Sequence, residues 1–408
     1  MEDFISVLAP PLKGLLIVVG IYVIYLIPLL LFVVAWKVWI LYRQTLFISK
    51  LEWLLLEIRI PRIIDKPPQA MEILLAIFNQ GKDGTFIERW WGGFVPAWFS
   101  LEIASFGGDV HFYIRTQKAF KSAIEAHVYS QFPEIEIKQV EDYTLRIPYE
   151  KASQSWDLWG VNFALTKADH FPIKTYVDYG LDKAPKEEVK VDPITPMIEV
   201  LGNILPGEEI WSQLLIRATT KRFIKPGTWF TKVDWKEAAK VEIFKLYHKD
   251  IKPQEGKFNI GEYTQTEGEK NSALAIQRSM EKAAFDCGWR FVYIAKKEQF
   301  NGGAISGIIG STKQFSSQHL NGFKLGQRVG FDYPWQDMTG QRVIKQKWQF
   351  FDAFRRRSYF YSPYKKPPFI LTTEEVATIY RFPGAVAGTP SLGRIESKRS
   401  EPPANLPL

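Results

Sequence analysis

The sequence predicts an α+β protein that carries a single transmembrane helix near its N-terminus. Three observations lead to this prediction: one long run without charge, an ordinary globular composition in the rest of the chain, and short alternating segments among segments of helical periodicity. Strands and helices that are mixed in this way are typical of layered α+β domains.

The uncharged run extends from Gly14 to Trp36 and is 23 residues long. A bilayer core of about 30 Å requires roughly 20 apolar residues in a helix, so this run is long enough to span it. A cleaved signal peptide has a shorter apolar core, of about 7–15 residues, followed by small residues at the cleavage site. We therefore expect an uncleaved anchor, with Trp36, Trp39 and Tyr42 in an interfacial aromatic belt.

The charges that flank the run predict its orientation. The N-terminal flank carries Glu2, Asp3 and only Lys13. The C-terminal flank carries Lys37, Arg43, Lys50, Arg59 and Arg62. Because positively charged flanks stay in the cytoplasm, we expect the N-terminus outside and the bulk of the chain inside.

Composition restricts the kind of partner and the compartment. The chain is 46% hydrophobic and 24% charged, with a formal net charge of +8. A basic balance favours anionic partners, either lipid head groups or nucleic acid. The single cysteine, Cys287, excludes an internal disulfide framework and a cysteine-based zinc site, and it fits a reducing compartment. We expect Cys287 to be a structural thiol.

Alternating segments predict two successive β-rich units after the anchor. In the first unit, residues 98–114 alternate on both sides of Gly107-Gly108, which is typical of a β-hairpin. A helix at 116–132 and a strand at 134–143 complete a β-β-α-β order. The second unit has predicted strands at 161–171, 174–181 and 208–219, and a helix at 192–205 that starts with Asp192-Pro193. Two such units suggest tandem ferredoxin-like α/β sandwiches.

The remaining segments are mostly helical in pattern. Residues 36–60 continue the anchor as an amphipathic juxtamembrane helix, although 54–60 could equally be a strand that Pro61 ends. Further helices are predicted at 69–80, 235–250, 266–286, 301–323 and 372–384, and a strand at 287–296. Thr266 and Glu269 have the spacing of a capping box, and Glu374-Glu375 fit the first turn of a helix.

The chain is divided accordingly into seven predicted segments. They are the N-terminal segment with the span (1–42), a juxtamembrane segment (43–95), two ferredoxin-like units (96–150 and 151–225), a third α/β unit (226–330), a basic-aromatic helical segment (331–385) and a proline-rich tail (386–408).

The sequence offers no catalytic, metal or cofactor motif. A P-loop needs G-x-x-x-x-G-K-[ST], and the nearest similarity, Gly307 to Lys313, has its lysine after the hydroxyl residues. Glycine-mediated helix packing explains that segment better. The five histidines are scattered without metal-ligand spacing, and His111 is predicted to be a solvent-facing strand residue. We therefore expect a non-enzymatic protein without a cofactor.

A basic-aromatic segment is the best candidate for binding an anionic partner. Its cations are Arg342, Lys345, Lys347, Arg355, Arg356, Arg357, Lys365 and Lys366, against one acid, Asp352. Its aromatic residues are Trp348, Phe350, Phe351, Phe354, Tyr359, Phe360, Tyr361 and Tyr364. Cations with aromatic faces suit single-stranded nucleic acid or an anionic surface. The alternative is a helix whose aromatic residues pack into the core while its cations are solvated or paired.

Several segments in order resemble a known family. They are LLEIRIPR, PAWFSLEIASFGGDVHFYIRT, AHVYSQFPEIEI, DPITPMIEVLGNILPGEEIWSQLLIR, FILTTEEVATIYRFPG and TPSLGRIESKRSEPPANLP. Together they are similar to the membrane-anchored N-terminal region, a domain of unknown function, of type IV secretion and conjugation-type proteins of Candidate Phyla Radiation (Patescibacteria) bacteria. In longer relatives, strings similar to the last two lead into a P-loop ATPase domain, whereas this chain stops at Leu408.

The resemblance implies a bacterial inner-membrane protein whose bulk is cytoplasmic. It leads us to expect a non-enzymatic scaffold or docking base in a type IV secretion-like apparatus, anchored in the lipid bilayer through residues 14–36. The expected partners are a separate P-loop ATPase or further copies of the chain. The alternative is a nucleic-acid-binding adaptor that delivers DNA to a translocase through residues 342–366.

Overall fold

The computed structural model describes residues 2–61, 66–82, 84–150, 155–182, 192–221, 223–224, 232–247 and 266–383, with side chains from Tyr22 onward. The predicted tail at 386–408 lies outside these residues. The chain divides into two compact units, which are described separately: Met1–Leu51 with Lys82–Pro96, and Glu52–Gly81 with Ala97–Leu408.

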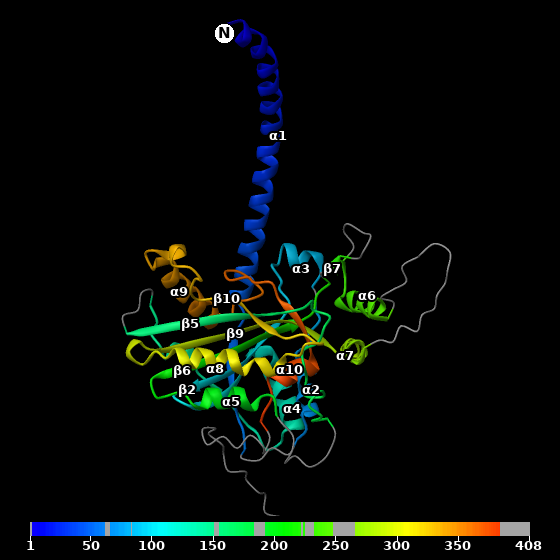
Figure 1. Cartoon of the computed structure of the whole chain (residues 1–408), viewed down its shortest axis with the longest axis vertical. Coiled ribbons are helices and arrows are strands. Elements are labelled where there is room, and N and C mark those ends of the chain that lie inside the picture. The colour runs from blue at the N-terminus through cyan, green and yellow to red at the C-terminus, as the bar shows by residue number, and fades with distance from the viewer. Residues whose placement is uncertain are drawn as a thin grey trace, which may run out of the picture. The chain divides into compact units, whose positions relative to one another are not determined.

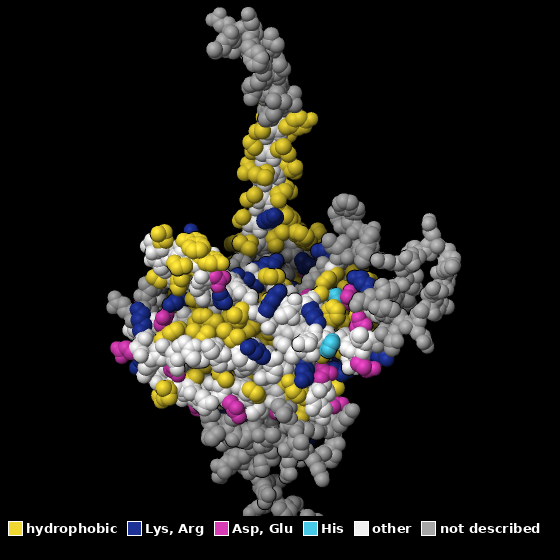
Figure 2. Space-filling model, viewed as in Figure 1, with side chains coloured by type: hydrophobic (Ala, Val, Ile, Leu, Met, Phe, Trp, Pro, Cys, Tyr) yellow, Lys and Arg dark blue, Asp and Glu magenta, His cyan; other side chains and the backbone are white. Residues whose placement is uncertain are grey.

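The first unit is built on one long helix, α1, from Glu2 to Ser49. From Tyr22 to Ser49 the helix is long and apolar enough to cross a membrane, and none of its most apolar window is buried. Figure 2 shows the apolar side chains along this part of the helix. The predicted span therefore lies within α1. Of the two alternatives for residues 54–60, the strand is confirmed and the helical continuation is wrong, because α1 ends at Ser49 and a strand begins at Trp53.

A short segment packs against the C-terminal third of α1. Its helix α3, Phe86–Trp90, starts with a capping box between Thr85 and Glu88. The ring of Trp90 stacks on that of Trp36 at 5.6 Å, and Arg43 Nε donates to the carbonyl of Trp91 at 2.6 Å. The ring centroids of Trp39 and Trp91 lie 6.2 Å apart in an edge-to-face arrangement, and those of Phe47 and Phe94 lie 5.5 Å apart in the same arrangement. We call these six rings (Trp36, Trp39, Phe47, Trp90, Trp91, Phe94) the aromatic collar.

The second unit is built on one antiparallel sheet of nine strands (Figure 1). The strand order is β10-β5-β9-β6-β2-β3-β1-β4, and β11 pairs with the first residues of β9. The strands are β1 Trp53–Arg59, β2 Trp98–Phe106, β3 Asp109–Gln117, β4 Glu136–Val140, β5 Trp156–Leu165, β6 Glu208–Ala218, β9 Ala284–Lys296, β10 Phe323–Arg328 and β11 Phe369–Thr372. A separate hairpin joins β7 Phe223–Ile224 to β8 Lys232–Val233.

Helices cover both faces of the sheet. One face carries α2 Pro68–Leu75, α4 Lys121–Gln131, α5 Thr195–Gly202, α8 Gly302–Ser311 and α10 Thr373–Ile379 over the larger core. The other face carries α9, Gln341–Arg355, over a second core (Figure 1). Helices α6 Trp235–Tyr247 and α7 Glu267–Glu281 share a third, small cluster. Short 3-10 turns lie at Ala76–Phe78, Lys118–Phe120, Tyr143–Leu145, Lys297–Gln299, Lys313–Phe315 and Pro334–Asp337.

The local predictions are confirmed where a turn or a cap determines the structure. The β2–β3 hairpin turns at Gly107 and Gly108, whose φ angles of 60° and 96° favour glycine. A Cβ on Gly108 would also come within 2.8 Å of the Gly202 carbonyl. The capping box of Thr266 and Glu269 starts α7, and the acidic pair at 374–375 lies in the first turn of α10.

The predicted separate ferredoxin-like units are not confirmed. Strands β5 and β6, both from the predicted second unit, are separated in the sheet by β9 from the predicted third unit. Strands β6 and β9 pair from Glu208 to Ala218, and nearly every residue of both is buried. A strand that is buried on both faces must pair along both edges, so β9 joins the predicted units into one sheet.

Several predicted elements differ from the observed structure, either in type or in where they begin and end. The predicted strand at 174–181 is wrong, because these residues form turns in which Thr175 Oγ1 donates to Glu374 at 2.5 Å. Helix α5 begins at Thr195, because Asp192 Oδ1 accepts from the amide of Ile194 in the preceding turn. Helices α7 and α8 end earlier than predicted, where the chain turns toward strands β9 and β10. The predicted helical C-terminal part is interrupted by β11 and is not confirmed as a unit.

We predict that Gly288→Ala destabilises the sheet unit by about 1–3 kcal/mol, because overpacking a filled site forces its neighbours to shift. A Cβ on Gly288 in β9 would lie 2.3 Å from the ring of Tyr359. The matched control is Gly310→Ala in α8, where a Cβ meets nothing within 4 Å. This control is expected to gain up to about 1 kcal/mol from helix propensity. Urea unfolding measures the free energy of unfolding of both variants. Equal changes in the two variants would contradict the prediction.

Candidate functional site

The aromatic residues of the basic-aromatic segment form core contacts. Phe350, Phe351 and Phe354 of α9 are buried against the sheet. The ring of Phe354 lies 5.3 Å from Trp211 of β6, and Phe351 lies 5.0 Å from Tyr149. Most of the rings that the sequence offers for base stacking are therefore turned inward, which matches the alternative of a core-packed helix.

Arg357 lies at the centre of a buried ionic cluster. Its Nε donates to Glu102 Oε1 at 2.9 Å and its Nη2 to Glu102 Oε2 at 3.0 Å, so the pair is bidentate. Its guanidinium also donates to Asp142, at 3.0 Å to Oδ1. Glu102 accepts further hydrogen bonds from Tyr143 at 2.7 Å and Gln213 at 2.9 Å. The Arg357 side chain is fully buried and does not reach a surface partner.

The cluster holds its members in their charged forms. Burial by itself raises the pKa of Glu102, but the charge and hydrogen bonds of Arg357 outweigh it and hold that pKa below its ordinary value. Burial likewise opposes ionisation of Asp142, and Arg357 again lowers the pKa of this carboxyl. Burial lowers the pKa of Arg357, but the two carboxylates raise it overall. The three groups therefore stay ionised at neutral pH.

The cluster also fixes the end of α9. Arg357 follows the helix with a left-handed φ of 51°, which costs a residue with a side chain about 1 kcal/mol or more. Glycine is the usual residue at such a position. The paired guanidinium explains why an arginine holds this conformation here.

The other predicted cations lie at different depths. Arg355 and Arg356 pair with Asp352, the latter at 2.8 Å, and Tyr364 donates to the same carboxylate at 2.8 Å. Lys347 pairs with Asp157 of β5. Arg342 donates to the Gln336 carbonyl at 2.9 Å. Lys366 is half-buried and donates to Gln327 of β10.

The exposed cations of the basic-aromatic segment are Arg342, Lys345, Arg356 and Lys365.

An exposed aromatic patch precedes α9. Tyr333 and Trp335 stack at 4.5 Å with an angle of 11° between their rings. Trp335 is 69% exposed and Met338 is 89% exposed. This patch lies within the predicted segment 331–385, but the predicted binding residues begin at Arg342 and do not include it. Large apolar residues between Gly330 and Gly340 that belong to no predicted helix or strand, namely Phe331, Tyr333, Trp335 and Met338, are the signal that could have indicated it.

The structure also places the residues with possible metal or phosphate chemistry. His111 is half-buried rather than solvent-facing, with Nδ1 at 2.8 Å from Glu57 and Nε2 at 3.0 Å from Asp109. Gly307 lies inside α8, where its Cβ position is 3.1 Å from Val200. Cys287 is buried in β9. Within the described part of the chain, no group of three His, Cys, Asp or Glu side chains is placed to hold a metal ion. His248 lies outside it.

We predict that Arg357→Met lowers the free energy of unfolding by about 3–5 kcal/mol at pH 7, because Glu102 would remain buried without its cation. The paired Glu102 has a lowered pKa, so it stabilises the fold above its unfolded-state pKa and loses this effect as pH falls. Unpaired, the same carboxyl has a raised pKa and destabilises the fold as pH rises. The difference between wild type and variant should therefore grow from about pH 4 to pH 7.

The control for this prediction is Arg356→Met, which removes a more exposed ion pair from the same helix end. This variant should lower the free energy of unfolding by about 1 kcal/mol or less. Chemical denaturation across this pH range measures both variants. A cost for Arg357→Met that is independent of pH would contradict the assignment.

A family model described as a domain of unknown function, DUF8128, matches residues 52–392, which is well over half of the chain. No curated protein matches the chain significantly. The chain therefore belongs to the DUF8128 family of domains of unknown function.

Proposed function

We propose that the chain is a membrane-anchored, non-catalytic docking base in a type IV secretion or conjugation-like apparatus. Helix α1 anchors it in the bacterial inner membrane, and the sheet unit, on the cytoplasmic side, binds a separate P-loop ATPase or further copies of the chain. The single observation that carries the proposal is α1, whose described apolar side chains are exposed along the helix.

The aromatic collar supports an anchor rather than a cleaved leader. The same helix that carries the apolar stretch holds Trp90 and Trp91 of a later segment through ring contacts and the Arg43 hydrogen bond. A cleaved signal peptide would leave these rings without their partners. Tryptophan is the residue that membrane interfaces favour, so the collar fits the level of the lipid head groups.

Charge and redox chemistry support the cytoplasmic side. Lys37, Arg43 and Lys50 follow the apolar stretch along α1, which is the arrangement of a helix whose C-terminal end faces the cytoplasm. The only cysteine of the chain is a buried core residue, as is common where thiols stay reduced.

The proposed docking surface is the exposed aromatic patch together with the exposed cations of α9. Tyr333, Trp335 and Met338 offer apolar area, and aromatic residues and methionine are enriched at protein interfaces. Arg342 and Lys345 are exposed beside it in sequence and favour an acidic partner.

A second candidate function is a nucleic-acid-binding adaptor that delivers DNA to a translocase. The observation that favours it is the stacked pair of Tyr333 and Trp335, which is exposed near cations of the basic-aromatic segment. The burial of Arg357 and of most of the segment's rings weakens it. Salt-sensitive binding of single-stranded DNA that is lost in Trp335→Ala would support the adaptor over the docking base.

We predict that the full chain stays in the membrane pellet after alkaline carbonate washing. The double variant Ile24→Lys with Leu30→Lys should appear in the soluble or aggregated fraction, because each central lysine costs about 2.5–3.5 kcal/mol of insertion. The control Ile73→Lys changes an exposed apolar residue of α2 in the sheet unit and should leave the protein in the pellet. Release of the unmodified chain by carbonate would contradict the anchor.

We predict that Lys345→Cys reacts with a membrane-impermeant maleimide only after cells are permeabilised. Lys345 is exposed and Cys287 is buried, so the new thiol dominates the labelling. Labelling of intact spheroplasts would place the sheet unit outside the cytoplasm and overturn the orientation. Turnover of ATP by the purified chain, at a rate normal for an ATPase, would overturn the non-catalytic role.

A further inference from the structure

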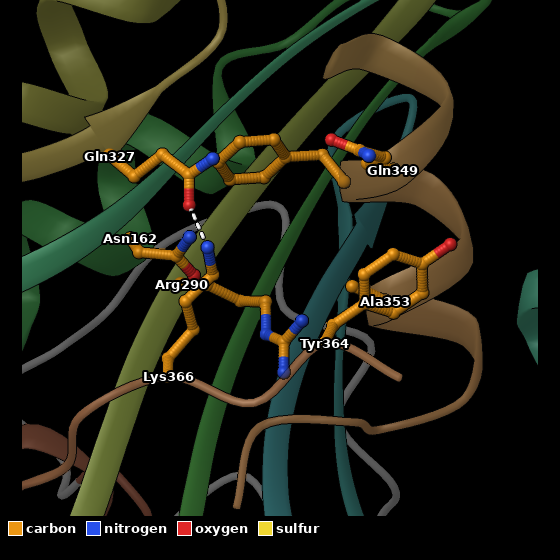
Figure 3. Close-up of a pocket in the computed structure, with 8 residues that line it drawn as sticks. Asn162, Arg290, Gln327, Gln349, Ala353, Tyr364 and Lys366 are labelled. Atoms are coloured by element: carbon orange, nitrogen blue, oxygen red, sulfur yellow. Dashed lines mark hydrogen bonds between the residues drawn. The ribbon is translucent and has the colours of Figure 1, made fainter. Parts of the chain in front are cut away.

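A small polar cavity lies beneath α9, at the strands on one side of the sheet (Figure 3). Its volume is about 30 Å³, and its polar lining comes from Asn162 of β5, Arg290 of β9, Gln327 of β10 and Gln349 of α9, with Tyr364 and Lys366 from the segment after the helix. Figure 3 shows the side chains of Asn162, Arg290, Gln327 and Lys366 grouped together at the strands, whereas the ring of Tyr364 extends toward α9.

Two buried polar atoms of this lining have no hydrogen-bond partner among the described residues. They are Nε of Arg290 and Oδ1 of Asn162. Arg290 is 2% exposed and Asn162 is 9% exposed. Arg290 uses Nη2 to donate to the Ser358 carbonyl at 2.7 Å, which leaves Nε as a fixed, unused donor. An unsatisfied buried donor costs about 1–3 kcal/mol, and more when it is charged.

The charge around the cavity is positive and uncompensated. Among the described residues neither Arg290 nor Lys366 forms a salt bridge, and the carboxylates of Glu102 and Asp352 are occupied by Arg357 and by Arg355 with Arg356. Burial lowers the pKa of Arg290 to about 10. Burial and then the charge of Arg290 lower the pKa of Lys366. A bound anion would favour the charged forms of both side chains.

We propose that this cavity binds a phosphate-type oxyanion. One oxygen enters the recess and accepts hydrogen bonds from Arg290 Nε and Lys366 Nζ, while the amides of Gln327 and Gln349 face the remaining oxygens. A half-turn of the Asn162 amide replaces its unpaired Oδ1 with an N–H donor. The positive lining excludes a metal cation, and the small volume excludes a bulky group, so the rest of the ligand lies toward the opening. The ligand is free phosphate or the phosphate monoester of a small molecule.

The test uses the full-length protein in detergent micelles, titrated calorimetrically with inorganic phosphate and, separately, with AMP. Sodium chloride at matched ionic strength is the reference. We expect saturable binding with either ligand, and at least a fivefold loss of affinity in Lys366→Gln. The matched control is Lys365→Gln, which removes the same charge from the exposed neighbour and should change affinity less than twofold. Arg290→Lys keeps the charge but removes the Nε donor, and it should weaken binding similarly.

The two ligands distinguish the two sources of the oxyanion. Equal affinity assigns the site to free phosphate, and tighter binding of AMP assigns it to a phosphate monoester. Absence of saturable binding by both ligands overturns the proposal, as does an equal loss in Lys365→Gln and Lys366→Gln. If Arg290→Lys fails to fold, the two lysine variants alone decide the outcome. None of these results depends on whether α1 spans a membrane.

Discussion

The ion pair between Arg357 and Glu102 is the interaction on which the rest of the sheet unit depends. It joins two positions that are 255 residues apart and fastens the end of α9 to strand β2. Because both charges are fully buried, removal of Arg357 leaves Glu102 without a cation in a low-dielectric interior, and removal of Glu102 leaves Arg357 with Asp142 as its remaining carboxylate. The pair therefore determines where the basic-aromatic segment lies and which of its side chains can face outward.

This constraint separates the segment into a buried side and an exposed side with different roles. Phe350, Phe351 and Phe354 complete the core over the sheet. Arg342 and Lys345, together with the Tyr333–Trp335 stack, remain available to a partner. Between the two sides, Arg290 and Lys366 face a small cavity without an acidic neighbour of their own. A docking surface and an oxyanion site can thus share one helix without sharing residues.

The sequence was informative where a few neighbouring residues determine the structure. The Gly107-Gly108 turn, the Thr266–Glu269 capping box and the long apolar helix are all confirmed, because each depends on local conformational or hydrophobic preferences. Strand order was not predictable, since alternation indicates a strand but not its partner. The three consecutive arginines at 355–357 look equivalent in the sequence. Only the fold shows that one is buried, because its partners Glu102 and Asp142 are distant along the chain.

A double-mutant cycle between Glu102 and Arg357 tests the central claim most directly. The unfolding free energies of Glu102→Gln, Arg357→Met and the double variant give the coupling energy of the pair. We expect a coupling energy of about 2 kcal/mol or more for this pair, against less than about 1 kcal/mol for the more exposed pair of Asp352 and Arg356 measured in the same way. A coupling between Glu102 and Arg357 that is no larger than that of the exposed pair would contradict the claim that this interaction holds α9 on the sheet.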